Sequence, residues 1–177
     1  MEIKIRKEEN RDHERVRLIT ELAFRNEPFS QQNEAGLIEA LRKRSSFIPE
    51  LSLVAEADGV VAGHSLFTPL TISNQADSYS SLALAPVSVH PEFQRKGIGK
   101  KLIAEGICLA RGLGYGSVLV LGNPEYYKNF GFKPAIDWNI IPKFMVPCEY
   151  FMALELSDGA LSDVSGYVDY PEEFDMV

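Results

Sequence analysis

The start of the chain shows a strand-like pattern of hydrophobic residues and then a helix-like one. Residues 2–7 place Ile3 and Ile5 between charged residues, and this period of two predicts a short strand with one buried face. From Asp12, which can cap a helix, to about Phe24 the apolar residues recur at helical spacing. A loop over 26–32 and a second short helix follow, and the inner stripe of that helix carries Leu37, Ile38 and Leu41.

The middle of the chain predicts a hairpin and then a buried strand. Two apolar segments, 52–56 and 60–70, flank the turn residues Ala57-Asp58-Gly59. The Asp-Gly pair favours a type I′ turn, because both central residues of that turn need positive φ. A polar stretch over 73–81 is expected to separate this hairpin from the strand at 82–90, whose almost wholly apolar composition is typical of a central strand.

The second half of the chain begins with an amphipathic helix. Residues 97–113 carry an apolar stripe at helical spacing, and residues 117–121 (SVLVL) predict another buried strand. A short helix is expected over 125–129, and the last sheet segments begin at Phe132, with 150–156 the clearest of them. Because strands and helices alternate in this order, the sequence predicts an α/β fold with a mixed sheet.

Composition supports a globular protein. The chain has 177 residues, of which 45% are apolar and 24% charged, and these values exclude a disordered chain. No apolar run approaches the ~18 residues of a membrane span, and the N-terminus lacks the apolar core of a signal peptide. We therefore expect a cytoplasmic protein without a membrane partner.

Charge divides the chain unevenly. The net charge is −7, yet residues 1–143 hold all 18 basic residues, whereas residues 144–177 hold eight acidic residues and no lysine or arginine. We expect a domain over 1–156 and an acidic extension over 157–177 that packs on the domain or trails from it. Nucleic-acid binding is not expected, because neutralising phosphates needs a basic face.

The two cysteines do not suggest a metal or disulfide site. Cys108 and Cys148 lie far apart, without a CxxC motif or a histidine at ligand spacing. We expect both thiols to be reduced and to serve as small apolar side chains. Cys108 falls near the apolar stripe of the helix at 97–113, so we do not expect it to act as a nucleophile. We expect no bound metal.

The segment that carries chemistry runs from Leu82 to Leu102. A buried strand leads into a glycine-bearing loop that opens directly into a helix, and such a junction directs N–H groups and the positive helix end at one point, which favours phosphate. Four basic residues cluster there: Arg95, Lys96, Lys100 and Lys101. A solvated basic helix start is the alternative.

Two common phosphate-binding motifs do not match this segment. A Walker A loop needs glycine at the position of Gln94 and serine or threonine at that of Lys101. A dinucleotide fingerprint needs glycine at the position of Leu102 and an acidic residue ~20 positions on.

Gln94-x-x-Gly97-x-Gly99, after a strand that ends Val87-x-Val89-His90-Pro91, resembles the acetyl-coenzyme A (acetyl-CoA)-dependent N-acetyltransferases of the GNAT superfamily. A bacterial branch of that superfamily shares segments similar to LALAPVSV and LGNPEYYKNFGF, so the resemblance covers residues 2–156. It implies a single α/β (α+β) domain in which a mixed central sheet is flanked by helices and splayed between its two central strands.

The resemblance also implies how acetyl-CoA, the cosubstrate, is held. The backbone N–H groups of the loop would bind its pyrophosphate, and the backbone of Val87 and Val89 would pair with the pantetheine arm. Pro86 agrees with an opened strand edge, because proline cannot donate a ladder hydrogen bond. The loop residues concerned are Gln94, Arg95, Lys96, Gly97, Ile98, Gly99 and Lys100.

A second segment, Gly122–Phe132, supplies the implied catalytic group. In the family, a tyrosine four residues before a Gly-Phe pair lies beside the cofactor sulfur, and Tyr127 has that spacing from Gly131. A phenol with a pKa of about 10 can protonate the departing thiolate. Asn123 is a further candidate for cofactor contact. The alternative is that the tyrosines only pack.

The reaction implied is direct attack of an amine on the acetyl carbonyl. The candidates for the group that takes the amine proton are Glu27, Glu34, His64 and His90, and the sequence does not choose among them. The oxyanion donor is expected near Val87. The alternative is an acyl-CoA-binding sensor without activity, which would not need Tyr127.

The acceptor is expected between residues 24–41 and 136–151, where aromatic and acidic residues would suit a cationic amine. The residues concerned are Phe24, Phe29, Trp138, Phe144, Tyr150, Phe151, Glu27, Glu34 and Glu149. The acceptor, a small molecule or a protein, stays open, and so does the choice between monomer and homodimer.

Overall fold

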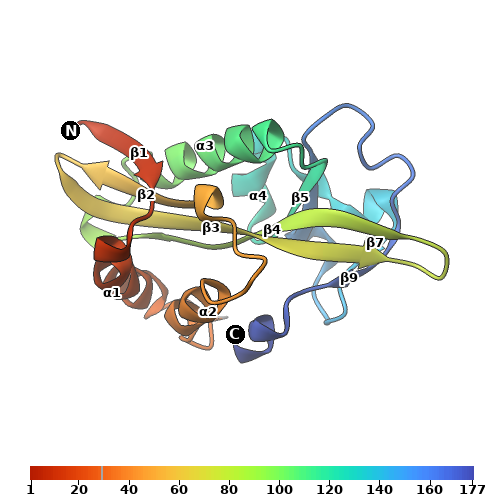
Figure 1. The fold of residues 1–177 in the computed structure, drawn as a ribbon, viewed down its shortest axis with the longest axis horizontal. Helices are drawn as coiled ribbons and strands as arrows, with labels where there is room; N and C mark the ends of the chain where they lie inside the picture. Colours follow the sequence, from red (N-terminus) through yellow and green to blue (C-terminus); the bar gives the residue numbers. More distant parts are fainter. Residues whose placement is uncertain (29) are drawn as a thin grey trace. The chain divides into compact units, whose positions relative to one another are not determined.

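The computed structural model describes residues 1–28 and 30–177. The chain forms two compact units: Met1–Thr68 with Ala85–Leu109 and Glu172–Val177, and Pro69–Leu84 with Ala110–Pro171. Three elements pass from one unit to the other, and Figure 1 labels them: β3 (Val60–Ser73), β4 (Ser78–Val89) and α3 (Ile98–Gly112).

The first unit is built on an antiparallel arrangement of β1 (Ile3–Lys7), β2 (Ser52–Ala57) and the first part of β3. The predicted hairpin between β2 and β3 is confirmed. Asp58 and Gly59 have φ of +49° and +82°, which is the positive φ that a type I′ turn needs.

Helices cover both faces of the sheet strands in this first unit (Figure 1). Neighbouring side chains of β2 pack against different helices. Val54 packs with Val16 of α1 (His13–Phe24) and Ile38 of α2 (Glu34–Leu41). Its neighbours Leu53 and Ala55 belong instead to a cluster with Ile98 and Leu102 of α3. Because successive strand residues point to opposite faces, α1 and α2 cover one face and α3 the other.

Two glycines allow α3 to lie close to β3. A Cβ on Gly63 would lie 2.9 Å from Ile98 Cγ2, and a Cβ on Gly106 would lie 2.0 Å from Phe67 Cε2. Phe67 is fully buried, so its ring has no space into which it can move. The absence of side chains at these two positions therefore fixes the distance between helix and strand.

We expect Gly106→Ala to destabilise the protein, although alanine favours a helix. Overpacking against Phe67 should lower the free energy of unfolding by about 1–3 kcal/mol, which urea titration measures. The matched control is Gly112→Ala on the same helix, where a Cβ meets nothing within 4 Å. That control should be neutral or gain up to about 1 kcal/mol. Equal stability of the two variants would contradict the packing argument.

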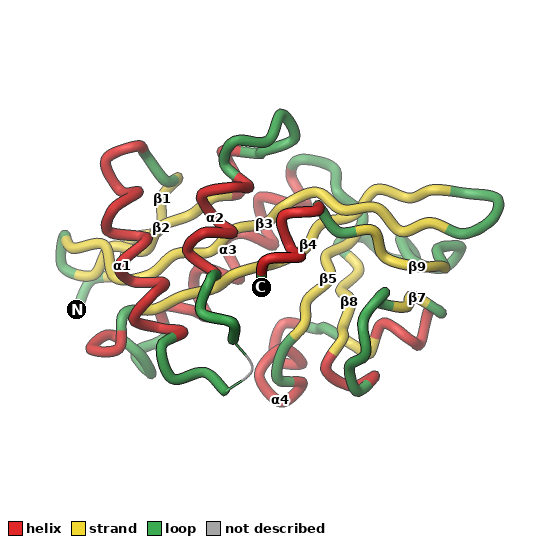
Figure 2. Tube along the Cα trace, turned by 90° about the horizontal axis from the view of Figure 1, so that it is seen from below, coloured by secondary structure: helices red, strands yellow, loops and turns green. Residues whose placement is uncertain are grey.

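The strands of the second unit pair in both parallel and antiparallel directions, and Figure 2 shows their course along the Cα trace. Parallel pairing joins β4 to β5 (Ser117–Leu121) at Leu82↔Val118 and Ala83↔Leu119. β8 (Phe151–Glu155) is antiparallel to β5 and to β6 (Lys133–Pro134). β9 (Gly166–Asp169) is antiparallel to β3 and parallel to β7 (Ile140–Ile141). The predicted α/β class with a mixed sheet is confirmed.

The prediction for the polar stretch at 73–81 is wrong. β3 continues to Ser73 and β4 begins at Ser78, so only a tight turn separates them. Asn74 closes that turn, because its Oδ1 accepts hydrogen bonds from Ala76 N at 2.9 Å and Asp77 N at 2.8 Å. The polar end of β3 pairs with β9, a strand from far along the chain, and this pairing extends β3 to Ser73.

The C-terminal residues 157–177 contribute to both units. β9 belongs to the second unit, whereas the 3₁₀ turn at Glu172–Met176 belongs to the first. There, Phe174 and Val177 pack against Leu37 and Leu41 of α2 and Leu66 of β3. Arg44 Nη1 also lies 2.6 Å from Glu173 Oε2.

Candidate functional site

The loop between β4 and α3 lies on the surface of the first unit. Its residues Gln94–Gly97 are exposed, whereas Ile98 is buried and anchors the first turn of α3 against β3. Two residues have left-handed backbone, Arg95 with φ of +60° and Gly97 with φ of +84°. A Cβ on Gly97 would meet nothing within 4 Å, so its backbone is open to a ligand.

The start of α3 offers hydrogen-bond donors and positive charge together. The first helical bond runs from Lys101 N to Gly97 O at 3.1 Å, so the preceding N–H groups have no carbonyl one turn earlier. No acidic residue stands in the first turn of α3. Arg95, Lys96, Lys100 and Lys101 are all exposed around it. The arrangement suits a phosphate or pyrophosphate.

The end of β4 turns alternate backbone groups away from β3. His90 N donates to Ala62 O of β3 at 2.9 Å, so the backbone groups of Val89 and Val87 point away from β3. Gln94 Nε2 donates to Val89 O at 3.1 Å. The side chain of Gln94 therefore ties the loop to the strand edge by occupying Val89 O. The N–H and C=O groups of Val87 and the N–H group of Val89 are left for the predicted pairing with pantetheine.

A buried hydrogen bond connects this strand edge to α1. Thr20 Oγ1 and Ser88 Oγ lie 3.0 Å apart, and both side chains are buried. Ser88 stands between Val87 and Val89, so the contact fixes the last turns of α1 beside the segment of β4 predicted to bind the cofactor. Serine and threonine in apolar segments have no distinctive spacing, so the sequence alone does not reveal this pair.

Tyr127 belongs to the second unit, at the end of the short helix α4 (Pro124–Tyr127). Its ring makes edge contacts with Tyr126 at 5.2 Å and Phe132 at 5.7 Å between ring centroids. Burial, together with the neighbouring Tyr126, raises the pKa of the Tyr127 phenol. The hydroxyl therefore stays protonated at neutral pH, as a proton donor must.

Gly122 starts the segment that was expected to supply the catalytic group, and its own role becomes visible only in the fold. A Cβ at this position would lie 2.4 Å from Cε2 of Tyr127, so the ring can lie against the backbone only because residue 122 is glycine. Asn123 caps α4, since its Oδ1 accepts a hydrogen bond from Glu125 N at 2.9 Å. That bond gives Asn123 a structural role beside the predicted cofactor contact.

His64, one of the candidate bases, is fully buried on β3. Its Nε2 lies 3.1 Å from Ser52 Oγ and 3.7 Å from Glu8 Oε1, and Arg42 also pairs with Glu8. Burial lowers the pKa of His64. Burial opposes the charge on Glu8, but the neighbouring His64 and the hydrogen bonds from Arg42 and Ser52 outweigh it and hold the pKa of Glu8 well below the ordinary value. The cluster is a buried structural network.

We expect the free energy of unfolding to fall as the pH drops below about 6.5. The unfolded chain then protonates His64, whereas the folded protein resists because its His64 pKa is lowered. Glu8, whose pKa is also lowered on folding, adds a second loss below about pH 4.5. Urea unfolding across this range measures both losses. His64→Gln should abolish the first, and an undiminished first loss in that variant would contradict the assignment.

The other candidate bases differ in exposure. Glu27 is exposed, and His90 is half-buried with its Nδ1 accepting from Glu92 N at 3.3 Å. Glu34 is buried and lines a pocket between α1 and α2 with Phe24. Phe29 lies outside the described residues. In the second unit, Phe144 contacts Phe151 at 6.2 Å, Trp138 is half-buried, and Tyr150 and Glu149 are exposed.

The expectation that both thiols serve as small apolar side chains is wrong, because Cys108, on α3, and Cys148 are both exposed. Within residues 1–28 and 30–177, no three histidine, cysteine or acidic side chains are grouped so that they could hold a metal ion. No helix in the described part of the chain is long and apolar enough to cross a membrane.

Comparison with known proteins identifies the family. The family model for the acetyltransferase (GNAT) domain matches residues 49–134. The Escherichia coli protein YhbS, named an uncharacterized N-acetyltransferase, is 32% identical over 147 residues, which cover 82% of this chain and 86% of YhbS. This chain belongs to the GNAT family of N-acetyltransferases.

A second relative and two solved structures support the same family. The E. coli N-acetyltransferase YjhQ, also named uncharacterized, is 42% identical over 106 residues, and the aligned segment spans 60% of this chain and 59% of YjhQ. The crystal structure of YhbS in complex with CoA superposes with a TM-score of 0.84 at 29% identity, covering 98% of this chain and 92% of that one. A GNAT acetyltransferase from Brucella melitensis in complex with acetyl-CoA gives 0.80 at 37% identity, covering 98% and 99%. The chain is therefore an acyltransferase with the GNAT fold.

Proposed function

We propose that this protein transfers the acetyl group of acetyl-CoA to the primary amine of an acceptor. The observation that carries the proposal is the start of α3, where exposed N–H groups, two left-handed residues and four basic side chains meet without an acidic residue. The CoA and acetyl-CoA held by the two similar solved structures support the choice of ligand.

The loop is proposed to hold the pyrophosphate of acetyl-CoA. The N–H groups of Gly97, Ile98, Gly99 and Lys100 supply donors, and the helix end stabilises the negative charge. The side chains of Arg95, Lys96 and Lys100 add positive charge, and Gln94 keeps the loop against β4 through Val89 O. The pantetheine arm is proposed to lie along the outward backbone groups of Val87 and Val89.

The transfer step is a direct substitution at the thioester. The neutral amine nitrogen attacks the acetyl carbonyl carbon, a C–N bond forms, the C–S bond breaks, and the sulfur leaves with the electron pair. In our proposal Tyr127 donates its phenolic proton to that sulfur, and the nitrogen loses one proton to water or a base. The proton lost by the nitrogen restores the phenol of Tyr127, so the net products are the acetylated amine and CoA with a free thiol.

Turnover is tested by thiol release. Purified protein with acetyl-CoA and a panel of primary amines should release free CoA in step with the acetylated amine, detected by mass spectrometry. An acyl-CoA-binding sensor would bind CoA but produce neither product. CoA binding without acetylation of any small amine, peptide N-terminus or lysine side chain would overturn the enzymatic part of the proposal.

A further inference from the structure

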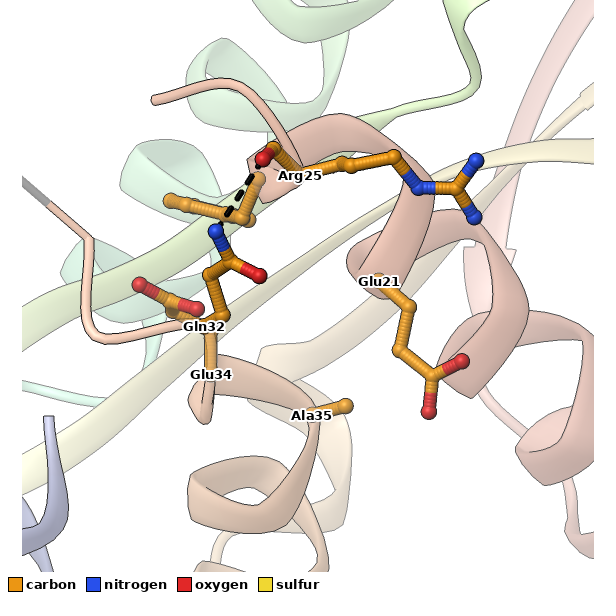
Figure 3. A pocket seen from close by; sticks show the side chains of 6 residues that line it. Glu21, Arg25, Gln32, Glu34 and Ala35 are labelled. Atoms are coloured by element: carbon orange, nitrogen blue, oxygen red, sulfur yellow. Dashed lines mark hydrogen bonds between the residues drawn. The ribbon is translucent and has the colours of Figure 1, made fainter. Parts of the chain in front are cut away.

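A pocket in the first unit lies where β1 ends and α1 begins. Two segments that are far apart in the sequence, within residues 7–13 and 42–52, line it. Its volume of ≈ 420 Å³ falls in the range of small-molecule sites. It shares no residue with the pocket beside Glu34, whose lining Figure 3 shows, nor with the loop before α3.

Arg42, which follows α2, is the charged group built into this pocket. Its side chain is only 10% exposed, and Glu8 holds it by accepting hydrogen bonds from Arg42 Nε at 3.2 Å and from Arg42 Nη2. Among the described residues, no acceptor pairs with Arg42 Nη1. The ion pair therefore fixes the guanidinium in one orientation and leaves one of its donor groups for a ligand.

The two carboxylates that line the pocket are already paired. Both oxygens of Glu8 are occupied, because Ser52 Oγ donates to Oε2 at 2.7 Å and Arg42 reaches both oxygens. Glu9 is exposed, and its Oε2 lies 2.9 Å from Arg11 Nε. A cation in the pocket would therefore find neither carboxylate unpaired.

The polar groups that remain available around the pocket are donors. Lys7 Nζ lies 3.7 Å from Glu50 Oε1, beyond hydrogen-bond distance, so its ammonium can still donate. His13 is half-buried at the start of α1, and its ring has no hydrogen bond with another described residue. An imidazole carries an N–H donor in either charge state. Together with Arg42, these groups favour an anionic ligand.

Two apolar rings complete the lining, those of Phe47 and Pro49. Phe47 is half-buried and packs against the cluster of Leu37, Leu41 and Leu66, which holds it in place. Apolar surface of this kind suits the hydrocarbon part of a ligand rather than a bare inorganic ion.

We propose that this pocket binds a small carboxylic acid with an apolar body. The carboxylate accepts hydrogen bonds from Arg42 Nη1, Lys7 and His13, and the apolar body lies against Phe47 and Pro49. Glu8 already orients the guanidinium, so the ligand does not have to order it. A single negative charge is favoured over a doubly charged phosphate, because the carboxylates of Glu8 and Glu9 stand nearby. The inference does not depend on the proposed acetyl transfer.

The test uses three probes, each titrated calorimetrically into the native protein: 3-phenylpropanoate, 3-phenylpropan-1-ol and acetate. The first carries both the carboxylate and an apolar body, and each of the others lacks one of them. 3-Phenylpropanoate should bind saturably and at least ~10-fold more tightly than either. Equal binding of 3-phenylpropanoate and its alcohol, or no binding of the acid, would overturn the inference.

Saturating CoA should leave the Kd for 3-phenylpropanoate unchanged, because the pocket shares no residue with the loop before α3. Displacement of the acid by CoA would place it at that loop and overturn the inference. The titration without CoA stands by itself, so a failure of the proposed function does not decide this result.

Two variants locate the bound acid. Lys7→Met should weaken 3-phenylpropanoate binding by ~5-fold, whereas Lys4→Met, which removes an exposed charge from β1 outside the pocket, should not change it. Arg42→Lys keeps a cation for Glu8 but loses the second arm of the guanidinium, so binding should fall at least ~10-fold. Should Arg42→Lys fail to fold, the lysine pair decides. Native affinity in Lys7→Met or in folded Arg42→Lys would overturn the inference.

Discussion

Gly97→Glu should weaken the binding of CoA by at least ~100-fold, because it acts on the loop in two ways. Gly97 has φ of +84°, a conformation that costs a residue with a side chain roughly 1–2 kcal/mol. The new carboxylate would also place a negative charge at the helix end that the pyrophosphate is proposed to occupy. A Cβ at this position meets nothing within 4 Å, so the fold should persist. Calorimetric titration with CoA measures the loss.

Gly59→Glu is the matched control for this variant. Gly59 has φ of +82° in the exposed turn between β2 and β3, and a Cβ there also meets nothing within 4 Å. The substitution therefore introduces the same strain and the same charge outside the loop. Its Kd for CoA should equal that of the native protein. If both glutamate variants bound CoA normally, the loop would not be the pyrophosphate site.

Tyr127→Phe should lower kcat by ~10²-fold or more while leaving the Kd for CoA unchanged. Phenylalanine can keep the contacts with Phe132 and the close approach to Gly122, so only the hydroxyl proton is lost. Burial raises the pKa of the native phenol, and the proton is thus present throughout the neutral range. Steady-state thiol release, with CoA titration alongside, measures both quantities.

Tyr126→Phe provides the comparison, since Tyr126 is the T-shaped neighbour of Tyr127 and is 39% exposed. Its kcat should stay close to that of the native protein. An unchanged kcat in Tyr127→Phe would reduce Tyr127 to a packing residue and require another proton donor. An equal fall in both variants would indicate a disturbed aromatic cluster rather than a lost proton.

Local patterns in the sequence were sufficient for the elements that depend on near neighbours. The Asp58-Gly59 turn and α3 follow from turn chemistry and from helical spacing, and both stand where they were expected. The polar end of β3 and the return of the chain at Glu172 depend instead on partners far along the sequence, β9 and α2. Hydrophobic periodicity contains no information about such partners.

The candidate site shows the same division. The loop at 94–100 could be found because glycines and basic residues recur at a fixed spacing between a strand and a helix. Gly122 and Ser30 act through single side-chain contacts, with Tyr127 and Glu34, that only the folded chain creates.

Calorimetric titration of the native protein decides whether the loop before α3 binds the pyrophosphate of acetyl-CoA. Acetyl-CoA and CoA should bind saturably with one site per chain. NAD also carries a pyrophosphate, but it has no pantetheine arm that could pair with the strand edge at Val87 and Val89, so it should not bind. Absence of CoA binding, or equal binding of CoA and NAD, would contradict the account.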